Sequence, residues 1–151
     1  MNSSLDIILK TEAGSLIFAP VNVREGDGKF DFNITCVLVG RFSGVLSGNF
    51  VCRLFRGDIE RLLIYFYDHV QMLMAGGGET PSFVPLEGDI QIKALDGDVV
   101  DMLDGYFTIN ILFNCGKPDE ASSNVYFGFE AVVELSELNK FCDGLRRLVF
   151  S

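Results

Sequence analysis

Residues 41–74 read RFSGVLSGNFVCRLFRGDIERLLIYFYDHVQMLM, and they join a strand pattern almost directly to the longest helix pattern of the chain. Before Arg56 one set of apolar residues falls only on even-numbered positions, as in a strand with one buried face. Beyond Asp58, which is placed to cap a helix, they recur every three or four positions and define one helical face. The junction predicts a helix packed on a sheet. The apolar residues are Phe42, Leu46, Phe50, Cys52 and Leu54 in the strand, and Ile59, Leu62, Leu63, Phe66, Val70 and Leu73 in the helix.

Three strands are predicted before this junction, over Leu5–Lys10, Ser15–Val23 and a longer stretch that begins at Phe30. Pro20 lacks an N–H, so we expect it at a sheet edge or where regular pairing ends. Glu25–Lys29 is a loop by composition. Alternation predicts that the long strand buries its even-numbered apolar residues, Phe32, Ile34, Cys36 and Leu38.

A second group of strands follows the helix, which is expected to stop at Gly76-Gly77-Gly78. Asp96-Gly97 is typical of a type I′ turn, because both central residues of that turn need positive φ, and it predicts a hairpin between Asp89–Leu95 and Val99-Val100. An amphipathic pattern over Ser136–Phe150 predicts a final helix. The other predicted strands are Ser82–Leu86, Gly105–Asn114 and Asn124–Val133. Their inward residues include Phe107, Ile109, Ile111 and Phe113, then Val125, Phe127, Phe129, Ala131 and Val133.

These patterns together predict one α+β domain over residues 1–151. About eight mostly antiparallel strands form a β-sheet with two amphipathic helices packed on it, in the order four strands, helix, four strands, helix. The chain has no basic start followed by an apolar run, and no segment approaches the ~20 apolar residues that cross a bilayer, so we expect a cytoplasmic protein. The four cysteines, Cys36, Cys52, Cys115 and Cys142, lack CxxC spacing and are expected to be buried free thiols.

The acidic charge is placed unevenly along the chain. Residues 1–78 hold seven basic and eight acidic side chains, so nearly all of the net charge of −9 lies in residues 79–151. Such a surface repels nucleic-acid phosphate and anionic lipid, and it can steer a basic partner. The same acidity can also serve only solubility.

No group of residues predicts an active site. His69 is the only histidine, which excludes multi-histidine metal sites, and its place next to Val70 suggests the boundary of the core. The aspartates from Asp96 to Asp104 lack the spacing of a calcium loop, because no glutamate stands at the twelfth position. Gly76–Gly78 lacks the lysine of a phosphate loop and follows a helix instead of preceding one. The sequence therefore predicts a protein without metal or cofactor that is not an enzyme.

Taken whole, the pattern from about Phe30 to the end resembles the WapI family of small bacterial immunity proteins and its uncharacterised relatives. The resemblance rests on the residues that follow, as they stand in this chain: Asp31-Phe32-Asn33, the Phe42–Phe55 strand, the helix start Gly57–Leu62, the pair Phe83–Leu86 and Ile90–Ile92, the Asp96-Gly97 turn, and the late strand before a leucine-rich helix.

The resemblance implies a non-catalytic protein that binds and blocks a cognate toxin domain, such as a nuclease with a basic cleft. The acidic second half of the chain is compatible with this function, because complementary charge speeds capture. One alternative is a small-molecule-binding module with an apolar cavity between sheet and helices, or a general protein-interaction module. A hydrolase built from scattered carboxylates is a third, and the oligomeric state stays open. The candidate partner-binding residues are Glu87, Asp96, Asp98, Asp101 and Asp104.

Overall fold

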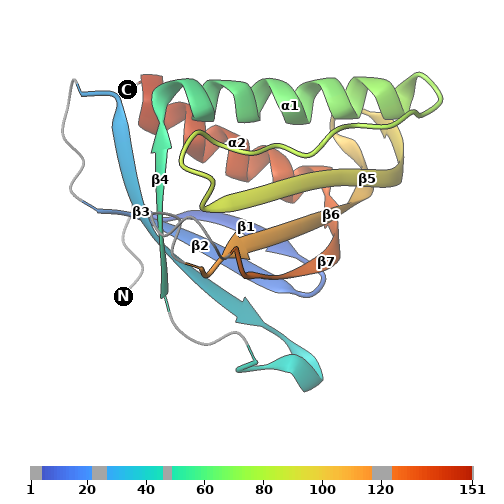
Figure 1. Cartoon of the computed structure of the whole chain (residues 1–151). Helices are drawn as coiled ribbons and strands as arrows, with labels where there is room; N and C mark the ends of the chain where they lie inside the picture. Colours follow the sequence, from blue (N-terminus) through green and yellow to red (C-terminus); the bar gives the residue numbers. More distant parts are fainter. Residues whose placement is uncertain (1–4, 22–26, 46–48, 117–123, 151) are drawn as a thin grey trace.

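The computed structural model describes residues 5–21, 27–45, 49–116 and 124–150, and it is an α+β fold with two helices on two antiparallel sheets (Figure 1). One sheet has the strand order β1-β2-β3-β4 and the other has β5-β6-β7. In the described residues there are thus seven strands in two sheets, where the sequence predicted about eight. The elements are β1 (Ile7–Thr11), β2 (Gly14–Val21), β3 (Lys29–Leu38), the 3-10 turn η1 (Gly40–Phe42), β4 (Asn49–Phe55), α1 (Arg56–Met74), β5 (Ile90–Asp101), β6 (Asp104–Asn114), β7 (Tyr126–Glu134) and α2 (Leu135–Phe150).

The alternation in the first sheet is confirmed by burial. Phe32 and Ile34 of β3 are fully buried, as are Cys52 and Leu54 of β4 to within 2%. The strand predicted from Phe42 is too long, because the chain forms η1 there and β4 begins only at Asn49. Leu46, a predicted core residue of that strand, lies outside the described residues. Pro20 lies beyond Phe18, the last residue of β2 that pairs with β1, so it stands at a sheet edge, one of the two places expected for it. The pairing of β2 with β3 continues through Pro20 to Val21.

Helix α1 begins at Arg56, two residues before the predicted cap, and Asp58 caps it from within the first turn. The Asp58 carboxylate accepts the N–H of Phe55 at 2.9 Å, which satisfies one of the backbone donors left free at a helix start. The predicted apolar face is confirmed, with Ile59, Leu62, Phe66 and Val70 buried. The helix ends at the three predicted glycines, Gly76 to Gly78, all of which have positive φ.

The predicted strand Ser82–Leu86 is wrong. Phe83 makes only an isolated bridge to Ile92 of β5, with N···O distances of 2.7 and 3.0 Å. Pro81 and Pro85 flank Phe83 at the positions whose N–H groups would extend the ladder toward β5, and proline has no N–H. The segment is therefore held to the sheet at one point.

The predicted turn at Asp96-Gly97 is also wrong, because β5 runs through it and turns only between Asp101 and Asp104. A β-bulge between Ala94 and Gly97 shifts the register, so that Ala94 and then Val99 face inward. A Cβ on Gly97 would lie 2.1 Å from the Tyr106 carbonyl oxygen. Gly97 therefore allows the backbones of β5 and β6 to approach closely and does not form a turn.

The helices pack on the same side of the two sheets (Figure 1). Helix α1 contacts β4 and β5, whereas α2 contacts β1, β6 and β7, and all of them contribute to one hydrophobic core. Gly144 lets α2 approach β1 closely, since a Cβ there would stand 3.0 Å from the Ile7 Cγ2 atom. The sheets meet where the Glu12 N–H donates to the Val132 carbonyl at 3.0 Å. In the described residues no helix is long and apolar enough to cross a membrane.

The apolar alternation of the last strand is buried only in part. Ala131 and Val133 of β7 lie in the core as predicted, but Phe127 is 53% exposed and Val125 is 44% exposed. Strand β7 is the last strand of its sheet, and the first half of it has no neighbouring strand on its outer side among the described residues. The prediction that these two residues are core is wrong.

Candidate functional site

Four of the five predicted partner-binding residues gather at one end of the second sheet. Asp96, Asp98 and Asp101 lie on β5 and Asp104 begins β6, and all four are exposed. Asp101 and Asp104 are the last register pair of the hairpin, and the Asp101 carboxylate accepts the N–H of Leu103 at 2.8 Å across the turn. In the part of the chain that the structure describes, none of these four carboxylates forms an ion pair with a basic side chain. We call these four residues the acidic hairpin.

Glu87 does not join the acidic hairpin, because it precedes β5 at the opposite end of that strand. The nine residues from Ile90 to Asp98 alone span roughly 25 Å, at about 3.3 Å per residue step. Glu87 lies instead near Arg53, whose pKa is raised mainly by its bond to Asp31 and to a lesser degree by Glu87. The Arg53 guanidinium holds Asp31 through two bonds of 2.7 and 3.0 Å. The charge of Glu87 is thus partly offset by a basic neighbour.

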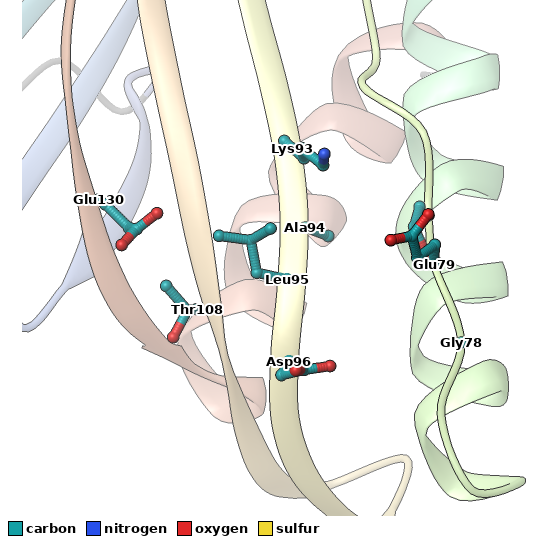
Figure 2. A pocket seen from close by; sticks show the side chains of 9 residues that line it. Gly78, Glu79, Lys93, Ala94, Leu95, Asp96, Thr108 and Glu130 are labelled. Atoms are coloured by element: carbon teal, nitrogen blue, oxygen red, sulfur yellow. The ribbon is translucent and has the colours of Figure 1, made fainter.

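A pocket of about 380 Å³ adjoins the acidic hairpin and is lined by the segment after α1 and by residues of β5, β6 and β7 (Figure 2). Asp96 lines it together with Glu79, from the segment after α1, and Glu130, from β7. Lys93 is the one basic side chain among its lining residues. Lys93 and Glu130 both pair with Asn110 of β6, the middle strand, so β5 and β7 lie roughly 10 Å apart at this level. Because the three carboxylates outnumber the one ammonium group, the pocket has a net negative charge.

Sequence reasoning missed Glu79 and Glu130. The outward period of β7 places Glu130 on the solvent side, but no local pattern says that β7 is two strands away from β5. Glu79 follows the glycine stop of α1, and the bridge at Phe83 leads its segment back along β5.

His69 lies beneath this pocket and is 2% exposed, so its prediction as a boundary residue is wrong. Its Nε2 bonds the Leu95 carbonyl oxygen at 2.8 Å, which requires a proton on that nitrogen. Its Nδ1 is 2.7 Å from the Thr80 hydroxyl and accepts from it. The ring also packs edge-on against Phe107 at 4.7 Å. Both nitrogens are hydrogen-bonded and the ring is buried, so His69 joins α1 to β5 and to the segment that precedes β5.

Burial lowers the pKa of His69 below its usual value of 6.5, although the Leu95 carbonyl and Asp96 act in the opposite direction. His69 therefore takes up a proton at a higher pH in the unfolded chain than in the folded chain. Above about pH 6.5 this difference does not affect the free energy of unfolding, and below that pH it lowers the free energy of unfolding progressively. We expect the free energy of unfolding, measured by urea denaturation, to fall as the pH drops from 6.5 toward 5. In His69→Leu the protein should be less stable throughout, but its free energy of unfolding should depend less on pH in this range. An unchanged slope in the variant would contradict the assignment.

Three of the four cysteines are buried thiols of low reactivity. Cys36, Cys52 and Cys142 are buried free thiols, as predicted, and burial raises the pKa of all three, that of Cys142 to about 11. Cys115 is exposed, so the prediction of burial is wrong for this thiol. Among the described residues, no three histidine, cysteine, aspartate or glutamate side chains are placed to hold a metal ion.

A small hollow of about 30 Å³ lies between the two helices, beside Phe66 of α1, Cys142 of α2 and Met102 of the β5–β6 turn. Its volume is far below the roughly 300–1,000 Å³ of typical ligand pockets, so it has little room for a small molecule. The apolar cavity between sheet and helices, one alternative raised by the sequence, stays a prediction.

No protein-family model fits the sequence, and a search of curated proteins finds no significant similarity.

Proposed function

We propose that this protein is a non-catalytic, immunity-type protein that binds and neutralises a cognate toxin domain in the cytoplasm. The observation that carries the proposal is the acidic hairpin, whose exposed carboxylates have no basic partner in the described residues and which continues into the pocket lined by Glu79 and Glu130. A surface of this kind attracts a basic protein and repels nucleic acid and anionic membranes. The partner would be a toxin domain with a basic cleft, such as a nuclease, that the acidic surface occludes without any cofactor.

The proposal is tested with the C-terminal toxin domain encoded by the neighbouring gene, scored for rescue of growth on co-expression and for a stable complex. We expect Asp96→Lys/Asp98→Lys/Asp104→Lys to slow association by roughly 10- to 1,000-fold at low salt and to abolish most of its salt dependence. Asp101 is kept because its carboxylate holds the turn. Association rates at low and high salt are measured by stopped-flow fluorescence.

A matched control separates position from net charge. Asp27→Lys/Asp68→Lys/Asp143→Lys changes the net charge by the same amount at exposed residues away from the acidic hairpin. Its association rate should fall much less. If both triple variants slow association equally, or if neither does, the acidic hairpin is not the binding surface. Glu87→Lys tests the opposite end of β5 on its own.

A further inference from the structure

The first half of β7 has an open hydrogen-bonding edge. The Val132 carbonyl accepts from Glu12, which is not part of β6, so Val132 points away from β6. Residues in a strand alternate between its two edges, and Gly128 and Glu130 therefore point the same way as Val132. Strand β6 gives the same assignment. The Asn114 N–H donates to the Asp89 carbonyl beside β5, so the even-numbered residues of β6 point toward β5 and its odd-numbered residues form the hydrogen bonds with β7. Gly128 and Glu130 have no backbone partner on this edge among the described residues.

The edges of β4 and β5 are at least partly closed. The N–H of Arg53 on β4 donates to the Asp89 carboxylate at 3.2 Å. On β5, Ile92 is bridged by Phe83 and the Ala94 N–H donates to the Tyr65 hydroxyl at 3.0 Å. Natural sheets usually protect an edge with lysine, proline or a bulge, but the stretch from Tyr126 to Glu130 has none of these and only one charge. This stretch therefore has an unprotected edge at which another strand can pair.

An apolar pocket of about 460 Å³ opens beside the same edge. Phe127 and Phe129 of β7 form one wall, and Leu38, Val39 and Val45, which follow or end β3, form the other. Val39 and Val45 are 58% and 66% exposed. Glu12 and Glu130 stand at the rim, and neither forms an ion pair among the described residues. The pocket thus offers an apolar floor with a negative border.

We propose that the open edge of β7 from Tyr126 to Glu130 is a docking site for an extended segment of a partner protein, which adds a strand to the sheet. The partner's backbone pairs with Gly128 and Glu130, and an apolar side chain enters the pocket between Phe127 and Val39. Lysine or arginine residues next to that side chain meet Glu12 and Glu130, which is why a basic segment fits better than an acidic one or a second copy of this acidic chain. The edge shares Glu130 with the pocket beside the acidic hairpin, but Phe127 and Gly128 lie toward the opposite end of β6 from that hairpin. Phe127→Ser therefore tests the edge separately from toxin capture.

The probe is a synthetic decapeptide in which valine alternates with lysine or threonine. It is titrated into the full-length, isotope-labelled protein while the backbone amide resonances of Gly128 and Glu130 are followed. We expect these two resonances to shift and their amide protons to exchange more slowly with solvent. The same peptide with glutamate in place of lysine should bind about tenfold more weakly or worse.

Two variants test the edge and the pocket. Glu130→Pro removes an outward N–H without touching the β6 ladder, a position where strands tolerate proline, and Phe127→Ser removes one wall of the pocket. Each should weaken peptide binding by about tenfold or more, whereas Val51→Ser, at a 75% exposed valine of the first sheet, should leave it unchanged. Equal binding by wild type and Glu130→Pro, or no shift at millimolar peptide, would overturn the proposal. A homodimer in sedimentation experiments that Glu130→Pro dissociates would assign the edge to a second copy and overturn the partner assignment.

Discussion

Asp58→Ala is expected to lower the free energy of unfolding by about 3 kcal/mol, measured by urea denaturation followed by circular dichroism. Asp58 is 3% exposed, and its carboxylate accepts the N–H groups of Phe55 and Leu86 at 2.9 and 3.1 Å. It also contacts the Arg61 guanidinium at 2.6 Å. Truncation leaves two backbone donors without their acceptor and one cation without its partner. The change therefore acts on the end of β4, on the start of α1 and on the segment before β5 at once.

Asp68→Ala is the matched control, because Asp68 is an exposed aspartate on the same helix. It should change the free energy of unfolding by no more than about 0.5 kcal/mol. Asp58→Asn keeps the shape of the side chain and one acceptor oxygen, and should give an intermediate loss. Equal losses for the alanine variants at positions 58 and 68 would mean that the buried carboxylate contributes no net stability.

Phe107→Ala is expected to lower the free energy of unfolding by about 3–5 kcal/mol, as measured for truncation of buried aromatic residues generally. Phe107 is fully buried at the centre of the interface between the second sheet and α1. Its ring centroid lies 4.7 Å from that of His69 and 6.5 Å from that of Phe66. The cavity would remove the packing surface that holds the His69 ring toward Leu95 and Thr80.

Tyr106→Ala tests the same strand on its other face. Tyr106 is 47% exposed, so its truncation should cost about 1 kcal/mol or less in the same urea experiment. The difference between the two neighbours measures the inward period of β6. If Tyr106→Ala is as costly as Phe107→Ala, the assignment of the inner face is wrong.

The sequence predicted those helices and strands in which the spacing of apolar residues alone indicates the buried face. In β3 and β6 the apolar residues alternate without interruption, and in α1 and α2 they recur with the helical period, so each pattern has only one stable arrangement against a core. Asp58 was predictable as a cap because a carboxylate at a helix start has few other uses. These elements account for the α+β class and for the order of strands and helices as far as α1.

The features that failed depend on residues whose role is decided by their neighbours in space. Gly97 is compatible with a turn and equally with close contact to the backbone of Phe107, and only the pairing with β6 selects the second. Phe83 has the composition of a strand, but the two prolines around it stop the ladder. The division into two sheets, and with it the pocket shared by Glu79, Asp96 and Glu130, follows from which strands end up adjacent, which no single window of sequence contains.

The order of strands within each sheet has a consequence for how the chain folds. Every strand pairs with a strand next to it in sequence, so both sheets can form through short loop closures with little entropy cost. The contact between Gly144 and Ile7 is different, because it joins the last helix to the first strand. During synthesis from the N-terminus, the apolar face of β1 stays uncovered until α2 has left the ribosome. This protein is therefore most open to misassociation while its first sheet is formed but not yet covered. The docking of α2 onto β1 ends this period.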